Sequence, residues 1–294
     1  MQRATRIPIP GVPSPVYHVS DTSSTLDLAA ALLADTTTAT PHLTTIIADH
    51  QSAGRGRLGR TWTTPDGQAL LASTIVSLPT SFPTEMLGWL VHACALSVRD
   101  ALSLRLSPLG HTVSLKWPND VLVDGARKIC GILAQLAPAS SPFTTSAILG
   151  YGINIAQDSD HLATPQATSL YAEGDSEAGA DPTSVSHTLL AQVLSGLDSR
   201  IRGLVTHGNA RDCGLADEAA NALPLLGTRI ALAKPTDPNG HPAMEGVALG
   251  LSPTGSLLVA TDDGRTHDIN AGDVLATGIP LTTVHDTKEK RANN

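Results

Sequence analysis

Apolar residues recur at helical spacing in three parts of the chain. Between residues 84 and 106, alanine, leucine and methionine follow the period expected of a helix. The run LDLAAALLAD also has a helical composition, and Ser24 or Thr25 is placed to cap it. The expected helices therefore span residues 24–35, 84–106 and 185–204.

Short apolar and β-branched runs between these helices predict strands. The run Thr44-Thr45-Ile46-Ile47 is rich in β-branched residues, which favour an extended chain. The pair Asp124-Gly125 between two apolar runs is a strong hairpin signal. Gly150 and Gly152 interrupt the last run without ending it. The expected strands span residues 44–47, 69–77, 113–117, 121–123, 129–136 and 145–155.

The pattern changes near Pro224. From residue 227 to residue 278, short alternating strands are separated by tight turns, which predicts a small β-barrel or sandwich of roughly 50 residues. The small, acidic residues 172–183 predict a loop. The proline-rich residues 1–16 predict an unstructured lead-in, and the polar residues after Val284 predict a disordered tail.

Composition limits the classes of function. The 294 residues, 41% of them hydrophobic, suffice for one large and one small domain. The formal net charge of -8 opposes non-specific nucleic-acid binding, which needs a broad basic face. The N-terminus lacks the apolar run of a signal peptide, and no stretch approaches the ~20 apolar residues of a membrane span. A soluble, cytoplasmic protein is expected.

The cysteines and histidines predict no metal or nucleophile motif. Cys94, Cys130 and Cys213 are widely spaced and form no CxxC pair, so they are expected to be small buried apolar residues in a reducing compartment. The 11 histidines show no zinc-binding spacing. A Gly-x-Ser-x-Gly elbow is also missing, so a serine nucleophile is not indicated.

The segment 54–62, Gly-Arg-Gly-Arg-Leu-Gly-Arg-Thr-Trp, carries the most specific chemistry. Glycines allow close approach of the backbone to a ligand, and arginines supply fixed positive charge for phosphate or carboxylate. The segment matches a dinucleotide fingerprint and nearly matches a phosphate loop. Both mechanisms need a helix to begin at the loop, whereas a turn and a strand follow here, so both are disfavoured. The remaining alternatives are an anion-binding loop that orders around its ligand and a solvated basic loop.

Three further groups of residues have both a functional and a structural interpretation. Lys116-Trp117-Pro118-Asn119-Asp120 can hold Mg²⁺ and phosphate together, or can be an ordinary turn. Lys128 enters an apolar strand, where its charge must be paired, used or extended to solvent. Gly131 and Gly152 indicate close backbone approach, or else bulges or tight strand crossings. Asn154 can read a base edge, support a metal or be structural.

Taken in series, these motifs resemble the biotin protein ligases. The resemblance is carried by Ser24-Thr25 and by residues 51–62, 116–120, 127–133 and 150–155, in the order and spacing of that family. It implies an α+β fold: a mixed β-sheet with helices, similar to the catalytic domain of class II aminoacyl-tRNA synthetases, and a small C-terminal barrel similar to Src-homology-3 domains. The expected domains are residues 17–223 and 224–284.

The resemblance also implies an activity. Biotin and MgATP would form biotinyl-5′-adenylate, and a lysine of a biotin carboxyl carrier domain would then attack it. The implied catalytic residues are Arg57, Lys128 and Asp120. The implied biotin contacts are Ser24, Thr25, Gln51, Arg55, Arg57, Lys128, Gly131 and Gly152. The implied ATP contacts are Arg57, Arg60, Trp62, Lys116, Asn119, Asp120 and Asn154, with Asp120 and Asn119 also serving Mg²⁺.

Two alternatives stay open at this point, and one departure from the family is visible. Leu26 stands where the family usually has asparagine after the Ser-Thr pair. A lipoate or octanoate ligase of the same fold would need an Arg-Arg-x-x-Gly-Gly-Gly pattern, which is missing. A DNA-binding biotin sensor would need an N-terminal winged helix, and only about 16 residues precede the first motif, so the monofunctional type without nucleic-acid or membrane partners is expected.

Overall fold

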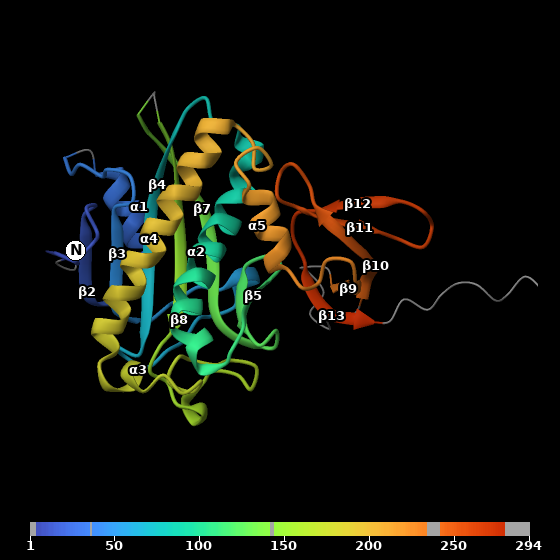
Figure 1. Ribbon diagram of the computed structural model, residues 1–294. Helices are drawn as coiled ribbons and strands as arrows, with labels where there is room; N and C mark the ends of the chain where they lie inside the picture. The colour runs from blue at the N-terminus through green and yellow to red at the C-terminus, as the bar shows by residue number, and fades with distance from the viewer. Residues whose placement is uncertain (1–3, 36, 142–143, 234–241, 280–294) are drawn as a thin grey trace, which may run out of the picture.

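The computed structural model describes residues 4–35, 37–141, 144–233 and 242–279, which form two β-sheets with helices around the larger one (Figure 1). The larger sheet has eight strands in the order β1-β2-β3-β4-β8-β7-β6-β5. Among the described strands, β2 and β3 are the one pair that runs parallel, so the sheet is mixed, as the resemblance implied. Its strands are β1 (Thr5–Ile7), β2 (Val16–Thr22), β3 (Thr45–Gln51), β4 (Ala69–Pro79), β5 (Val113–Lys116), β6 (Asp120–Val123), β7 (Arg127–Ser141) and β8 (Thr144–Asn154).

Helices cover both faces of this sheet. On one face, α1 packs its buried leucines against β3, β4 and β8 in a small separate core. On the other face, α2 and α4 pack against each other and enclose the main core of the molecule. The helices are α1 (Thr25–Ala34), α2 (Gly88–Leu106), α3 (Ser176–Ala180), α4 (Pro182–His207) and α5 (Leu215–Ala222).

A second, five-stranded antiparallel sheet lies beside the first in Figure 1, with α5 between them. Its order is β12-β11-β10-β9-β13, and it contains the short alternating strands expected after residue 227. The position of the domain boundary itself stays a prediction. The strands are β9 (Arg229–Ala233), β10 (Pro242–Leu251), β11 (Leu257–Ala260), β12 (Thr266–Ile269) and β13 (Asp273–Ile279).

The structure corrects several local expectations. The first 16 residues are not wholly unstructured, because β1 pairs with β2, a strand whose mixed polar sequence gave no signal. The predicted loop at 172–183 contains α3 and the start of α4, each begun by an aspartate cap, Asp175 and Asp181. Helix α5 was missed as well. The predicted tail after Val284 lies outside the described residues.

Two remaining features bear on composition. Within the described ranges, none of the helices has the length and apolar character needed to cross a lipid bilayer. Cys94 and Cys130 are buried free thiols and Cys213 is partly buried. Burial raises the pKa of Cys94 to about 12, so this thiol is a core residue and not a nucleophile.

Candidate functional site

A cavity of about 510 Å³ lies between the arginine loop (residues 54–62) and the larger sheet. Its size is within the range of small-molecule sites. All fourteen residues singled out from the sequence line it, although they come from five separate segments of the chain. They are Ser24, Thr25, Gln51, Arg55, Arg57, Arg60, Trp62, Lys116, Asn119, Asp120, Lys128, Gly131, Gly152 and Asn154. Their individual roles stay predictions.

The floor of the cavity is a row of residues that cross the sheet side by side. Asp120 on β6 pairs with Gly131 on β7, and Gly131 pairs with Gly152 on β8. Neither glycine forms a bulge, because the β7–β8 register is regular from Cys130 to Ala137. The two glycines therefore leave the surface of the sheet open to another group.

In this conformation, the indole of Trp62 lies on that glycine surface. A Cβ on Gly152 would be 2.6 Å from Trp62 Cε2, and one on Gly131 would be 3.2 Å from Trp62 Cζ3. Trp62 Nε1 is buried and has no hydrogen-bond partner among the described residues. A ligand ring against the two glycines would therefore have to displace the indole, so the roles expected for Trp62 and for the glycines require a movement of Trp62.

The contact between Trp62 and Gly152 can be tested by substituting the glycine. In the variant Gly152→Ala, the added methyl group must push the indole away, because it would lie 2.6 Å from Trp62 Cε2. Overpacking of this kind costs about 1–3 kcal/mol. For biotin, the ligand that the resemblance implies, we expect binding to weaken roughly tenfold, with a change in tryptophan fluorescence, measured by fluorescence titration. Gly250→Ala in β10 is the matched control, since a Cβ there meets no heavy atom within 4 Å. Equal affinities for both variants would contradict the prediction.

The arginine loop is folded into a small hydrogen-bonded turn. Gly56 N donates to Arg60 O at 2.7 Å, and Trp62 N donates to Gly54 O at 2.9 Å. Residues 57–59 form a single 3-10 turn, after which the chain continues into β4. A longer helix does not begin at the loop, in agreement with the low weight given to the dinucleotide and phosphate-loop interpretations.

The three arginines of the loop point to different partners. Arg55, which is 45% exposed, pairs with Asp27 of α1. Arg60 reaches across to Asp273 at the start of β13 in the smaller sheet. Of the three, Arg57 is the most buried, with 18% of its side chain exposed.

Arg57 is held mainly by neutral oxygens. Its Nη1 donates to Asn119 Oδ1 at 3.1 Å, and its Nη2 donates to the Gly272 carbonyl at 3.3 Å. The Asp273 carboxylate is 3.7 Å away. Burial lowers the pKa of Arg57, while the carboxylates of Asp273 and Asp120 oppose this shift. The guanidinium remains charged at neutral pH and is suited to an added anion.

The Lys128 ammonium is paired with a carboxylate, although about a third of its side chain (35%) is exposed. Its Nζ lies 2.7 Å from Asp120 Oδ1 and 5.7 Å from the centre of the Trp62 ring. The charge is thus paired across the β6–β7 hairpin and placed over the cavity floor. Its backbone is fixed too, because Lys128 N donates to Gln166 O at 2.6 Å and Thr168 N donates to Lys128 O at 2.8 Å.

The opposite end of the cavity is neutral and polar. Thr25 N and Oγ1 donate to Gln51 Oε1 at 2.8 and 3.0 Å, and Ser73 Oγ donates to Thr25 Oγ1 at 2.8 Å. Ser24 occupies the N-cap position of α1, yet its hydroxyl makes no capping hydrogen bond, so the expected side-chain cap is wrong. The hydroxyls of Ser24 and Thr25 belong to the cavity wall.

Asn154 is buried and already hydrogen-bonded. Its Nδ2 donates to Thr168 O at 2.9 Å, and its Oδ1 accepts from Gln157 Nε2 at 3.2 Å. These bonds hold the segment 157–170, which follows β8 and forms one wall of the cavity with Ala163, Thr164 and Ala167. The side chain of Asn154 therefore shapes the wall, and any contact with a nucleotide is additional.

Sequence reasoning missed two parts of the lining. One is the 157–170 segment, whose position just after the Gly150–Asn154 motif was the available signal. The other is residues 273–275 of the smaller sheet. Asp273 carries no local motif, and its link to the arginine loop joins positions 213 residues apart in the chain.

The chain is similar to known ligases along most of its length. Residues 20–154 match the biotin/lipoate A/B protein ligase family, and residues 236–275 match the biotin protein ligase C-terminal domain. The biotin--[acetyl-CoA-carboxylase] ligase of Mycobacterium tuberculosis is 34% identical over 230 residues, which cover 78% of this chain and 77% of the relative. The ligase of the same name from Paracoccus denitrificans is 31% identical over 224 residues, which cover 75% and 85%.

Solved structures agree on the fold. The biotin protein ligase of Aquifex aeolicus in complex with biotin and ATP superposes with a TM-score of 0.63 and 24% identity, covering 90% of this chain and 98% of that one. The biotin complex of the Leishmania major ligase has a TM-score of 0.55 and 23% identity, and the match covers 88% of this chain and 99% of that one. At these identities the likeness shows a shared architecture.

Proposed function

The chain belongs to the biotin protein ligase family, and from this premise we propose that it activates biotin with ATP and transfers it to a lysine of a biotin carboxyl carrier domain. The observation that carries the proposal is the cavity, which has a neutral polar end and, beside it, two positive charges from Arg57 of the arginine loop and Lys128 of β7. Such a site suits one ligand with a polar head and a carboxylate beside a second ligand with phosphates.

In the first step, a biotin carboxylate oxygen attacks the α-phosphorus of ATP, and pyrophosphate leaves. The carboxylate is ionised at neutral pH, so the step needs no general base. It needs two anions held together. Arg57 and Lys128 offset their repulsion, and Thr25 with Gln51 orients the biotin head group at the neutral end. Holding both reactants in place can lower the barrier by about 7–11 kcal/mol.

In the second step, the neutral amine of the acceptor lysine attacks the acyl carbon of the adenylate. The bond to the phosphate oxygen breaks, AMP leaves, and the amine loses a proton. Lys128 and Arg57 remain beside the departing phosphate and stabilise its charge. Trp62, once displaced from the glycines, covers the adenylate and keeps water from the reactive acyl group.

Mg²⁺ fits this site only together with nucleotide. The oxygen donors are Asp120 and Asn119, yet Asp120 Oδ1 faces the Lys128 ammonium and Asn119 Oδ1 accepts from Arg57. A divalent ion added alone would meet two positive groups, whereas phosphates supply the missing negative charge and ligands. When bound, the ion would neutralise charge on the phosphates. We assign its protein ligands to Asp120 and, through its amide oxygen, Asn119.

Substituting Asp120 tests that assignment. We expect Asp120→Asn to raise the magnesium concentration at half-maximal pyrophosphate exchange by about tenfold, because one carboxylate charge is lost from the ligand set. The measurement is a magnesium titration at saturating ATP. Asp273→Asn removes the other carboxylate that lines the cavity and is expected to leave the magnesium midpoint unchanged. A midpoint that does not move in Asp120→Asn would exclude Asp120 as a ligand.

Mass spectrometry of a carrier domain tests the proposed function directly. After incubation with this protein, biotin and MgATP, the carrier domain should gain the mass of one biotinyl group on one lysine. A parallel reaction with lipoate is expected to give no adduct, and labelled pyrophosphate should enter ATP only with biotin. An adduct from lipoate, or none from biotin, would reject the proposal.

A further inference from the structure

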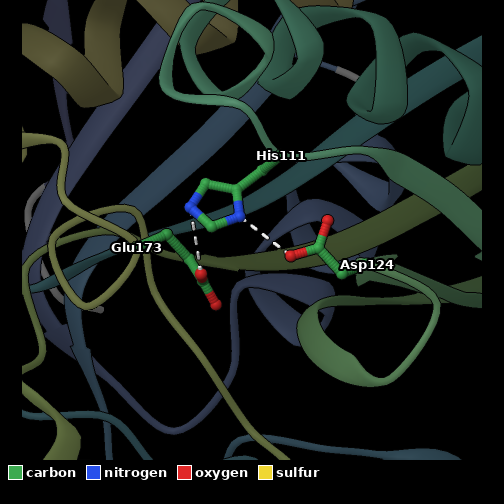
Figure 2. Close-up of side chains that lie close together, drawn as sticks. All are labelled: His111, Asp124 and Glu173. Atoms are coloured by element: carbon green, nitrogen blue, oxygen red, sulfur yellow. Dashed lines mark hydrogen bonds and ion pairs between the residues drawn. The ribbon is translucent and has the colours of Figure 1, made fainter.

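The side chains of His111, Asp124 and Glu173 meet beside the start of β7 (Figure 2), and Arg127 donates hydrogen bonds to both carboxylates. His111 lies just before β5, Asp124 is in the β6–β7 turn, Arg127 begins β7, and Glu173 follows the 157–170 segment. His111 Nδ1 is 2.8 Å from Asp124 Oδ2, and His111 Nε2 is 3.5 Å from Glu173 Oε2. The function proposed above uses none of these residues.

The donor types of this cluster would suit a metal ion, but its geometry does not. His111, Asp124 and Glu173 offer one nitrogen and two oxygens within 4.8 Å of one another. Arg127 Nη2 donates to the same two oxygens, at 2.7 Å from Asp124 Oδ2 and 2.9 Å from Glu173 Oε2. A cation placed between these ligands would therefore lie against a guanidinium.

Glu173 instead connects two parts of the cavity wall. Its Oε1 accepts from Arg127 Nε at 2.6 Å and from Thr168 Oγ1, also at 2.6 Å. Thr168 N in turn donates to the Lys128 carbonyl. The Glu173 carboxylate thus binds Arg127, the residue before Lys128, and Thr168, whose backbone bonds to Lys128. Glu173 itself does not line the cavity.

Glu173 is held at the centre of this link by hydrogen bonds from Arg127 and Thr168. The Glu173 side chain is 6% exposed, and burial by itself raises its pKa. Hydrogen bonds from Arg127 and Thr168 outweigh burial, so that its pKa is lowered overall. Removing one partner of a buried carboxylate with this many charge-assisted hydrogen bonds destabilises the local structure, because the remaining charge is left without compensation.

We propose that Glu173 is a positioning residue for adenylate formation, which holds the 157–170 segment and Lys128 at a fixed spacing through Thr168 and Arg127. The inference rests on the proposed function, since the segment acts as the nucleotide side of the cavity only if ATP binds there. Thr25 and Gln51, at the biotin end, make no contact with this link. Loosening it should therefore weaken ATP binding much more than biotin binding, whose head-group contacts do not depend on the link.

The test compares Glu173→Gln with Asp175→Asn. Asp175 also forms a buried bidentate pair, with Arg105 at 2.5 and 2.9 Å, only two residues further along, but it ties the chain to α2 and not to Lys128. For Glu173→Gln we expect KM for ATP to rise about tenfold and KM for biotin to stay within about twofold. Amide exchange in peptides covering 157–170 should become faster. Asp175→Asn should change neither quantity.

Thr168→Val gives a second, milder variant. It removes the hydroxyl that Glu173 accepts while leaving the Arg127–Glu173 pair in place. We expect the same direction of change in KM for ATP and in amide exchange. This variant decides the question if Glu173→Gln does not fold.

Three results would overturn the inference. The first is an unchanged KM for ATP in both Glu173→Gln and Thr168→Val. The second is an equal rise in Asp175→Asn, which would show a general loss of order. The third is one-to-one binding of Zn²⁺ by the wild-type protein in calorimetry that is lost in His111→Ala. Amide hydrogen exchange needs no catalytic turnover, so it tests the link independently of activity. Absence of biotin-dependent pyrophosphate exchange in the wild-type protein would instead reject the proposed function.

Discussion

Replacing Lys128 with alanine is expected to reduce biotin-dependent pyrophosphate exchange by a factor on the order of 10²–10³, the loss typical of removing one preorganised electrostatic group. The ammonium lies over the cavity floor, 2.7 Å from Asp120 Oδ1, and the strand that carries it is fixed by backbone bonds to residues 166 and 168.

The fold should survive this change. Lys128 is 35% exposed, and a pair of this exposure contributes at most about 1 kcal/mol. Pyrophosphate exchange and the melting temperature measured on the same sample separate the two effects. Lys128→Met keeps the apolar stem and should lose as much exchange as the alanine variant. Arg202→Ala removes a cation that is 76% exposed on α4 and should retain wild-type exchange. Wild-type exchange in Lys128→Ala would remove this residue from the mechanism.

Arg57→Ala is expected to cause a loss of similar size. The guanidinium is mostly buried and donates to neutral oxygens of Asn119 and Gly272. Among the described residues its nearest paired carboxylate, Asp273, is 3.7 Å away, so a bound phosphate or carboxylate would become its closest anionic partner. Removing Arg57 also takes away one of the two contacts between the arginine loop and the smaller sheet, while the Arg60–Asp273 pair remains. We expect pyrophosphate exchange to fall by a factor on the order of 10²–10³, with KM rising for both substrates.

Two variants separate charge from geometry at this position. Arg57→Lys keeps the charge and loses the two-pronged donor, and it should recover less than about tenfold of the lost activity. Arg200→Ala removes an arginine that is 14% exposed and paired with Asp100 and Glu218, which matches the burial of Arg57 away from the cavity. If Arg200→Ala lost as much exchange as Arg57→Ala, the effect would be one of folding.

Local sequence was a good guide wherever the chemistry was concentrated in short motifs. The Gly/Arg segment, the 116–120 turn, Lys128 and the paired glycines were each recognisable by residue type, and the structure brings them to one cavity. The Asp124-Gly125 turn was equally readable, because both residues have positive φ and the pair joins β6 to β7. In these segments a few adjacent residues determine both conformation and chemistry.

Other features had no local signal. Strand β2 has a polar, mixed sequence and is held as a strand by its neighbours β1 and β3. The place of Trp62 on Gly131 and Gly152 depends on a loop and two strands that meet only in the folded chain. The same is true of the Arg60 contact with Asp273 and of the cluster around Arg127.

The amino-acid sequence alone determined which chemical groups this protein possesses and the order in which they occur, because motif residues, glycines and turn signals act over a few neighbouring positions. Tertiary structure decided which of those groups face one another, since pairing between strands and burial of charge join residues that are tens to hundreds of positions apart. The partners of Arg57, Lys128 and Glu173 were therefore visible only in the fold.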